Sequence, residues 1–247
     1  MLFRSIYRRI EVLLVESGYL LPLFHDIDYR VANARVRRLN LLSTPPYVNY
    51  SYLGKLERAP TGAVRKETGG TIHVPVTGQI DNLDPSLAAL TVQTEVLPAV
   101  FETLTGEAEG ARIVPWLASE FHAEEGGKRF RFRLREDVRF HDGRRMNSRD
   151  VRYSFEHLLF NRESRSRWLL SPVGGAKELL NGAANDLQGF HIHSPSEFTI
   201  ELDHPISFFP ALLAYPAAAI VPEGTYQFCR KLARGMCRNG SFSRGAV

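Results

Sequence analysis

Cysteine is almost missing from this chain of 247 residues. Cys229 and Cys237 are its two cysteines, and both lie close to its end. The sequence before them therefore offers neither a disulfide framework nor a cysteine-based metal site. This scarcity leaves the cellular compartment open.

Long apolar runs are missing as well. None approaches the ~18 residues that a membrane-spanning helix needs. The first 24 residues, MLFRSIYRRIEVLLVESGYLLPLF, are interrupted by several arginines and glutamates. A secretory signal needs an uninterrupted apolar stretch and a small-residue cleavage site. No signal peptide is visible, so we expect that the true start of an exported form is missing.

Acidic residues are missing from the last part of the chain. The segment Tyr226–Val247 has five basic residues and no acidic one. Without those five, the chain has 26 basic and 27 acidic residues, so the net charge of +4 comes from this tail. A nucleic-acid-binding protein carries its basic footprint on a folded face. We therefore expect no nucleic-acid partner.

The composition that remains is that of a folded protein. Apolar residues make up 44% of the sequence and charged residues 23%, which excludes disorder for the whole chain. The length suits one large domain or two small ones. Near the start, apolar residues from Ile6 to Leu14 recur at helical spacing, and Gly18 is a typical helix stop.

A polar stretch then separates two parts of the chain. The range Val36–Leu42 alternates loosely, as a strand does. From Gly54 to Gly70 the chain is polar and rich in charge, glycine and threonine. This composition predicts a linker, which we place at residues 58–70.

After the linker, strand and helix patterns follow one another. TIHVPV at 71–76 predicts a strand, GQIDNLDP a loop, and Leu90–Leu104 a helix to which Pro98 is an objection. The order of these patterns predicts an α/β or α+β domain. Further strands are expected at Gly189–His193 and Phe198–Leu202, and a further helix at Phe208–Tyr215.

Two patterns stand out in the middle of the chain. In Lys128–Arg135 apolar residues alternate strictly with arginines, which predicts a half-buried strand with a solvated basic face. In Ser148–Leu159 apolar residues recur at helical spacing, and we expect Ser148 to cap the helix. Between them the Asp142-Gly143 pair suits a tight hairpin turn. Asp150 lies in the first helical turn, where its charge favours the helix dipole.

From Thr71 to Thr225 the order of features resembles the first lobe of family 5 bacterial solute-binding proteins. These are receptors for oligopeptides, dipeptides, nickel and related solutes. The strongest match is FRLREDVRFHDGRRMNSRDVRYSFEHLL, and DNLDPSLA, VFETL, IVPWLASEF and FTIELDHPISFFPALLA match in order. The resemblance implies an α/β class with mixed α+β content, the first lobe of an incomplete periplasmic-binding-protein type II-like fold. We expect its sheet to be mixed.

Residues 1–57 resemble the other end of the same family. LLVESGYLLPLFHDIDYRVANARVRRLNL is similar to the helix and strand that follow the second lobe. The chain would then carry the end of one receptor, a linker, and the start of another at residues 71–225. A tandem receptor array or a gene rearrangement gives this order. A generic N-terminal helix and strand is the alternative.

The resemblance implies a solute held between two lobes, with loop residues near the first strand lining the cleft. By position, the candidate ligand-binding residues are Gln79, Asp81, Asn82 and Asp84, with Glu95 and Phe101 behind them. Each also has a structural interpretation. Asp84 before Pro85 is typical of a turn and helix start, and Glu95 fits a solvated helix residue.

Histidine-containing motifs give no convincing metal or catalytic site. On a strand, His25 would lie on the opposite face from the acidic residues beside it. His191 and His193 share a face but have no third ligand nearby, so we expect solvated or hydrogen-bonded histidines. His141-Asp142 lies in the predicted turn, and the chain has no G-x-S-x-G nucleophile motif. We expect no catalysis, no metal and no cofactor.

The leading interpretation is a non-enzymatic receptor, or a fragment of one, that captures peptides or similar small solutes for an ABC permease. The intact protein would be periplasmic or extracellular and associated with the membrane. One alternative is the solute sensor of a transcription regulator that joins a helix-turn-helix to a family 5 domain. Residues 1–70 show no convincing helix-turn-helix. A nonfunctional product of a disrupted gene is the third interpretation, and the neighbouring genes separate the three.

The tail at 226–247 departs from the family pattern, and we predict that it is read in a shifted frame. The family continues toward a segment like Gly-Thr-Gly-Pro-Phe, whereas this chain reads YQFCRKLARGMCRNGSFSRGAV. Codons can be chosen for Leu232–Ala246 that, read one nucleotide later, encode Val-Gly-Thr-Gly-Pro-Phe within a longer match. Sequencing of the gene tests this, because the shifted frame must then encode a second lobe.

Overall fold

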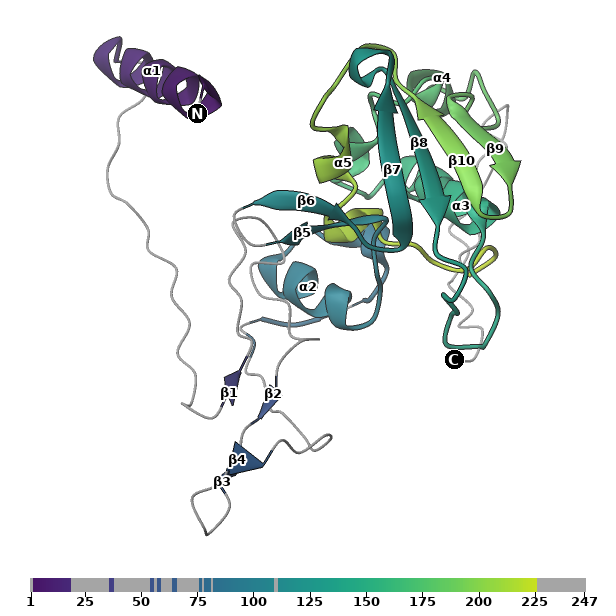
Figure 1. The fold of residues 1–247 in the computed structure, drawn as a ribbon. Coiled ribbons are helices and arrows are strands. Elements are labelled where there is room, and N and C mark those ends of the chain that lie inside the picture. The colour runs from purple at the N-terminus through teal and green to yellow at the C-terminus, as the bar shows by residue number, and fades with distance from the viewer. Residues whose placement is uncertain are drawn as a thin grey trace. The chain divides into compact units, whose positions relative to one another are not determined.

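The computed structural model describes residues 2–18, 36–37, 54–55, 57–58, 64–65, 76, 78–80, 82–108 and 111–225. The chain divides into two compact units, residues 1–36 and 37–247, and Figure 1 shows the ribbon. The His25 motif, both cysteines and the tail after Thr225 lie outside the described residues. Predictions about them stay predictions.

The first unit contains the helix α1 (Leu2–Glu16). Ile6, Ile10 and Leu13, from the predicted apolar stripe, are all exposed. The chain leaves the helix where Gly18 has a positive φ of 74°, a conformation that costs glycine little because it has no Cβ. The predicted helix and its stop are confirmed.

Short strands of two residues follow. They are β1 (Val36–Arg37), β2 (Gly54–Lys55), β3 (Glu57–Arg58) and β4 (Val64–Arg65), and β3 pairs antiparallel with β4. β1 is the described part of the strand predicted at Val36–Leu42. Of the strand predicted at 71–76 only Val76 is described, and it is not in a strand. The boundaries of the linker stay a prediction.

Three short helical elements come next. They are η2 (Pro85–Leu87), α2 (Thr91–Val96) and η3 (Leu97–Ala99). The single helix expected over Leu90–Leu104 is therefore wrong beyond Val96. Pro98 has no N–H to donate, so the α-helical ladder gives way to a 3-10 turn that carries Pro98 near its start. Leu104 is fully buried whereas Val100 is exposed, although one continuous helix would place these two residues on the same face.

Four strands form the main sheet, in the order β7-β8-β10-β9 (Figure 1). Every pairing between the described strands of this sheet is antiparallel, so the expectation of a mixed sheet is wrong for this part of the chain. Short turns join β7 to β8 and β9 to β10, and such turns return the chain antiparallel to itself. The strands are β7 (Ala118–Glu124), β8 (Arg129–Leu134), β9 (Phe190–Ser194) and β10 (Glu197–Glu201), and a separate antiparallel hairpin consists of β5 (Thr105–Ala108) and β6 (Arg112–Pro115).

Strands β8 and β10 supply the centre of the core. Phe130 and Phe132 of β8 lie opposite Ile200 and Phe198 of β10, and all four are at most 1% exposed. The rings of Phe132 and Phe198 stack with their centroids 5.3 Å apart. A pair of this kind contributes about 1 kcal/mol beyond the apolar area that it buries. The half-buried strand predicted at Lys128–Arg135 is confirmed.

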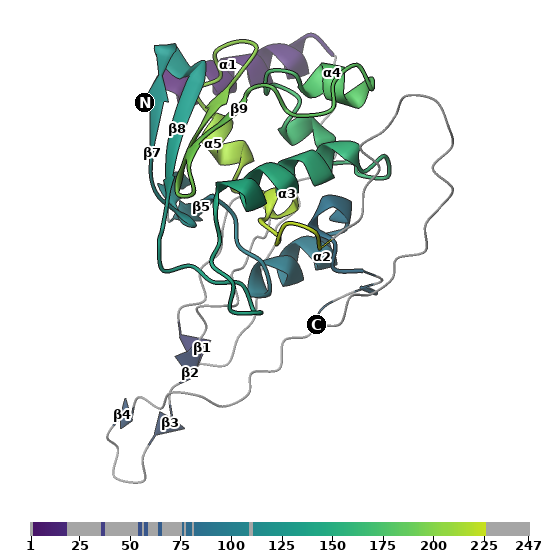
Figure 2. The same ribbon diagram turned by 90° about the vertical axis from the view of Figure 1, so that its right-hand side faces the viewer.

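The helix α3 (Ser148–Phe160) packs on the inner face of this sheet (Figure 2). Phe155 of α3 meets Phe190 of β9 edge to face, with the ring centroids 6.0 Å apart. Val151 and Phe155 are buried, as the helical spacing predicts. The predicted helix and the side that it buries are confirmed.

The N-cap of α3 is Asn147, and the expectation that Ser148 caps the helix is wrong. The Asn147 side chain accepts a hydrogen bond of 2.8 Å from the backbone N–H of Arg149. Ser148 is fully buried as the first helical residue, and its hydroxyl donates to the carbonyl of Ser194 over 2.9 Å. Asparagine caps well because its amide oxygen reaches the first unpaired N–H groups.

The remaining elements are short. They are η4 (Glu125–Gly127), η5 (Arg167–Leu169), α4 (Ala176–Leu180), α5 (Phe209–Leu212) and η6 (Pro216–Ala218). The helix expected over Phe208–Tyr215 is therefore shorter than predicted and ends at Leu212. Tyr215 is extended, because Pro216 disfavours a helical conformation at the residue before it. Among the described residues, no helix is long and apolar enough to cross a membrane.

Three backbone segments meet tightly beside β10. The Gly189 N–H donates to the Gly174 carbonyl over 2.7 Å, the Glu201 N–H donates to the Gly189 carbonyl over 2.7 Å, and the Gly174 N–H donates to the Glu201 carbonyl over 2.9 Å. A Cβ on Gly189 would lie 2.5 Å from the Glu201 carbonyl oxygen. Only glycine fits at this position.

Candidate functional site

A short buried segment around Asp84 leads into α2. The Asp84 carboxylate accepts a hydrogen bond of 2.9 Å from the backbone N–H of Ser86 and thereby caps η2. Pro85 follows at the start of that turn, where a missing N–H costs little. The Gln93 side chain accepts hydrogen bonds from two successive N–H groups just before α2. The turn and helix-start role that the sequence offered for Asp84 is therefore present.

The Asp84 carboxylate also faces His157 of α3. Both carboxylate oxygens lie 3.0 Å from Nε2 of the imidazole, and the two side chains are only 4% and 7% exposed. Ser86 Oγ lies 3.3 Å from the same nitrogen and accepts a hydrogen bond of 2.7 Å from Asn161 Nδ2. Four polar side chains thus join this segment to α3 where water does not compete.

Serine, histidine and aspartate together match a nucleophilic triad in composition but not in geometry. In a triad, the histidine directs one ring nitrogen to the carboxylate and the other to the hydroxyl. Here Asp84 and Ser86 both approach Nε2 of His157. The ring therefore does not stand between hydroxyl and carboxylate as a proton relay. The arrangement is suited to holding the segment in place.

His157 belongs to a series of polar residues along one face of α3. Asp150, Ser154, His157 and the C-cap residue Asn161 follow at i, i+4, i+7 and i+11, a spacing that puts them on one side of a helix. We call these four residues the polar line. Its first half binds residues 221–223, and its second half binds residues 84–86. One helix face therefore holds an early and a late segment of the chain.

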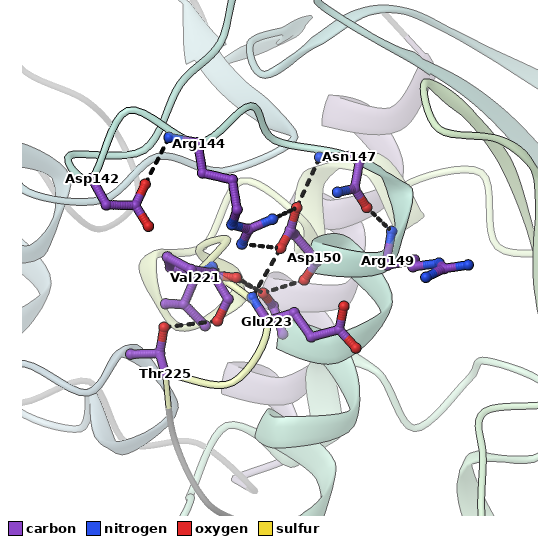
Figure 3. Close-up of polar contacts among 10 residues, drawn as sticks. Asp142, Arg144, Asn147, Arg149, Asp150, Val221, Glu223 and Thr225 are labelled. Carbon is purple, nitrogen blue, oxygen red and sulfur yellow. Dashed lines mark hydrogen bonds and ion pairs between the residues drawn. The ribbon is translucent and has the colours of Figure 1, made fainter. Parts of the chain in front are cut away.

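Asp150, which is fully buried, is the centre of the first half (Figure 3). Its carboxylate accepts hydrogen bonds of 2.6 and 3.2 Å from the Arg144 guanidinium. It also accepts bonds of 2.9 Å from the backbone N–H groups of Asn147 and Glu223. The bond to Asp150 raises the pKa of Arg144 above its ordinary value. These donors satisfy a charge that would be costly to bury alone.

Ser154 completes the first half of the polar line. Its hydroxyl oxygen accepts a hydrogen bond of 2.9 Å from the Val221 N–H and donates over 2.7 Å to the Asp150 carbonyl. Residues 221–223 are thus fixed on α3 by two successive members of the line, Asp150 and Ser154.

Sequence reasoning found Asp150 but missed His157, Ser86 and Asn161. The available signal was the spacing of the polar line, which runs beside the predicted apolar stripe of the same helix. A polar residue that recurs at helical spacing next to a buried stripe needs a partner. The partner itself, some 70 residues away in the sequence, could not be read from that spacing; the contact joins positions 84 and 157.

The structure separates the six candidate ligand-binding residues. Gln79 and Asn82 are exposed, whereas Asp84 is buried. Glu95 is buried on α2, so the interpretation of a solvated Glu95 is wrong. The remaining two are Phe101, half-buried against the core, and Asp81, outside the described residues. Contact of any of the six with a solute stays a prediction.

Apolar side chains accompany the two exposed amides. Ile80, Leu83 and Leu90 are 37%, 43% and 54% exposed. Ile80 and Leu83 directly follow Gln79 and Asn82 in the sequence, so amide groups and aliphatic groups occur on one short segment, and Leu90 stands at the start of α2. Amides can bond the peptide main chain, and apolar side chains can contact ligand side chains.

The arginines of β8 point outward, as the alternation predicts, and acidic residues accompany them. Arg131 lies 3.2 Å from Glu197 of β10 and 3.4 Å from Glu124 of β7. Arg133 lies 3.4 Å from Glu120. Exposed pairs of this kind stabilise a fold by less than about 1 kcal/mol each. Because their charges are matched, this face does not form a basic footprint.

The predicted histidines have ordinary surroundings. His191 and His193 on β9 are exposed, and Nε2 of His193 lies 2.7 Å from Oγ1 of Thr199. His141 and Asp142 lie in an exposed turn, where Asp142 accepts from the Arg144 N–H. Within the described part of the chain, no three histidine, cysteine or acidic side chains are arranged to hold a metal ion.

Comparison with known sequences identifies the class of protein. Residues 112–242 match the sequence model of the family described as bacterial extracellular solute-binding proteins, family 5 Middle. This match covers more than half of the chain. The chain therefore belongs to family 5 of the bacterial extracellular solute-binding proteins, a family of binding proteins by its description.

Individual relatives support the same assignment. The chain is 25% identical over 171 residues to the periplasmic murein peptide-binding protein MppA of Escherichia coli, which is 68% of this chain and 31% of MppA. It is 26% identical over 159 residues to the oligopeptide-binding protein OppA of Bacillus subtilis, with 62% of this chain and 29% of OppA covered. The chain thus spans about a third of the length of these relatives.

Solved structures agree on the fold. The unliganded open form of MppA superimposes with a TM-score of 0.54 at 26% identity, over 58% of this chain and 28% of MppA. OppA of Burkholderia pseudomallei gives a TM-score of 0.55 at 22% identity, over 61% of this chain and 30% of that protein. The predicted family and the predicted mixed α+β lobe of an incomplete binding-protein fold are confirmed.

Proposed function

We propose that this chain supplies one lobe of a peptide-type solute receptor and binds its solute without catalysis. The observation that carries the proposal is the relation to MppA and OppA, which are described as murein peptide-binding and oligopeptide-binding proteins. The segment with Gln79 and Asn82 precedes residues 112–242, which the family model matches. The cleft-lining role of that segment is part of the proposal.

The chemistry of the segment supports a peptide in preference to an ion. Among its described residues the exposed groups are the amides of Gln79 and Asn82 and the aliphatic side chains of Ile80 and Leu83. Such groups bind uncharged polar and apolar surface, whereas a metal ion requires a cluster of carboxylate, imidazole or thiolate ligands. The described residues contain no such cluster.

The relation to the family supports the partners and the compartment that we propose. An ABC permease would receive the solute from the intact receptor, and the intact receptor would act in the periplasm or outside the cell. MppA is described as periplasmic, which supports this compartment. A sensor domain of a transcription regulator is the alternative, and the matched charges on β8 do not favour contact with DNA.

A nuclear magnetic resonance titration tests the proposal. The full chain, labelled with ¹⁵N, is titrated with the tripeptide Ala-Ala-Ala up to millimolar concentration. We expect chemical-shift changes at the amides of Gln79, Asn82 and the start of α2. Replacing both Gln79 and Asn82 by alanine should abolish the changes.

A matched control uses an exposed asparagine elsewhere. Asn185→Ala lies in an exposed stretch after α4, so it should leave the titration unchanged. Shift changes confined to the outer face of the sheet, or none at all, would contradict the proposal. Operon sequencing provides a second test, because permease and ATPase genes favour transport.

A further inference from the structure

We propose that His157 is a positioning residue for solute binding. It acts through Asp84 and Ser86 and fixes the place of the exposed segment that precedes them. The proposal rests on the proposed function, because the segment matters for solute only if it lines the cleft. His157 itself is buried and does not reach solvent.

The position of the segment 78–83 depends on the contacts at its two ends. It has no regular secondary structure in its described residues. At one end Gly78 packs against α2, because a Cβ there would lie 3.3 Å from Cγ1 of Val92. At the other end Asp84 is held by His157 at 3.0 Å. A stretch without a hydrogen-bonded ladder of its own takes its position from such anchors.

His157 is itself held in place by the helix that carries it and by a neighbouring ring. It projects from the middle of α3, which packs on the core of the sheet. The ring of Tyr153, one turn earlier, stacks on the imidazole with the centroids 6.3 Å apart and the planes 7° apart. The imidazole therefore presents Nε2 to Asp84 from a rigid element. A site supported by rigid elements is held more accurately than one supported by loops.

The polar line contains a second residue, Ser154, with which His157 can be compared. Ser154 lies one turn before His157 on the same face but binds the late segment at Val221. A residue that merely stabilised α3 would loosen both segments when it is replaced. A residue that positions the early segment would loosen only that one. Replacement of His157 should therefore loosen the early segment and replacement of Ser154 the late one, and an experiment can distinguish the two results.

The experiment is hydrogen exchange of the full chain, measured by mass spectrometry without any solute. His157→Leu removes the donor at Nε2, whereas in His157→Gln the side-chain amide nitrogen reaches a similar position. We expect amides of residues 78–90 to exchange ~10 to ~100 times faster in H157L, the factor that corresponds to one lost hydrogen bond to a charged group. H157Q should restore most of the protection. Amides of β8 and β10 should keep their rates in both variants.

Ser154→Ala is the matched control. It should speed exchange at residues 221–223 and leave residues 78–90 unchanged. Asp84→Asn gives a second variant in case H157L folds poorly, since an amide oxygen can still accept from the Ser86 N–H, whereas an amide nitrogen replaces the second carboxylate oxygen that faces Nε2. It should speed exchange at residues 78–83.

The outcomes separate the two proposals. Unchanged exchange at residues 78–90 in H157L and D84N overturns the positioning role, and so does an equal increase in β8 and β10. The result does not depend on solute, so failure of the Ala-Ala-Ala titration would overturn the proposed function while leaving the anchor intact. If both hold, H157Q should retain the shift changes of the titration and H157L should lose them.

Discussion

Asp150 accepts hydrogen bonds from three stretches of chain: the turn with Arg144, the cap at Asn147 and the late segment at Glu223. A buried carboxylate with this many donors holds those stretches together, and its removal leaves them without an acceptor. We predict that Asp150→Asn lowers the free energy of unfolding by about 3 kcal/mol, in the range for breaking a buried charged pair. Urea unfolding followed by circular dichroism measures the change.

The control for this prediction is Asp142→Asn. Asp142 is exposed in the hairpin turn and accepts one hydrogen bond, from the Arg144 N–H. Its substitution should shift the urea midpoint much less than the substitution of Asp150. Equal urea midpoints for the two variants would contradict the prediction, because the buried carboxylate would then stabilise the fold no more than the exposed one.

Gly189 is a second residue whose substitution should destabilise the fold, because no Cβ fits at its position. An alanine Cβ there would lie 2.5 Å from the Glu201 carbonyl oxygen and 2.8 Å from the Gly174 nitrogen. Both neighbours are backbone, so the clash can be relieved only by moving the junction beside β10. We predict that Gly189→Ala costs about 3 kcal/mol of unfolding free energy, as strong overpacking does.

Gly174→Ala is the matched comparison at the same junction. Its nearest neighbours would be the Glu201 carbonyl oxygen at 3.4 Å and the Gly189 Cα at 3.5 Å, which is ordinary contact. Thermal unfolding of the two variants should therefore separate them clearly. A Gly174→Ala variant as unstable as Gly189→Ala would contradict the steric explanation.

Among the elements, α3 shows how a cap is chosen. Two polar residues, Asn147 and Ser148, stand next to each other at its start, and Ser148 was the cap that we expected. The structure uses Asn147 because Ser148 is needed elsewhere: its buried hydroxyl bonds the carbonyls at the turn between β9 and β10. That tertiary contact cannot be read from local spacing.

The capping role gives a prediction at the level of the helix. Asn147→Ala should lower the unfolding free energy by about 1 kcal/mol, the usual effect of removing an N-cap side chain. Arg149→Ala, which changes an exposed side chain and keeps the capped N–H, should have a smaller effect. Chemical unfolding with both variants checks this, and an unchanged Asn147→Ala would contradict it.

The sequence predicted elements well where one pattern decides them. Strand β8 and helix α3 each bury one face, so alternation and helical spacing located both. Prediction was poorer where tertiary contacts or proline decide, as in α2 and α5, which stop at or before a proline. The antiparallel order of the sheet also escaped prediction, because pairing between β8 and β10 joins positions 60 residues apart or more.

The candidate site was predictable in part for a similar reason. Family position led to Gln79 and Asn82, which are exposed, and to Asp84, which is buried and capping. A sequence pattern marks where a polar residue stands but not which way it faces. Only the fold reveals that Asp84 points to His157 and that Glu95 is buried.

At the scale of the whole molecule, the length of the match bears on affinity. The chain spans 31% of MppA and 29% of OppA. A two-walled site buries most of a ligand, and a single wall leaves about half of it in water. Losing half of the binding free energy changes an affinity of ~1 µM into one of ~1 mM.

We therefore predict that this chain alone binds peptides only weakly, in the millimolar range. Calorimetry with a library of short peptides should show no dissociation constant in the micromolar range. The reason is physical: the polar groups on the solvent side of the bound peptide keep their water, and the exposed segment offers only a few amide and aliphatic contacts. Replacing Gln79 and Asn82 by alanine should remove whatever millimolar binding remains, whereas Asn185→Ala should leave it. Micromolar or tighter binding by the chain alone would overturn the prediction, because a single lobe would then bind as tightly as is expected of two lobes together.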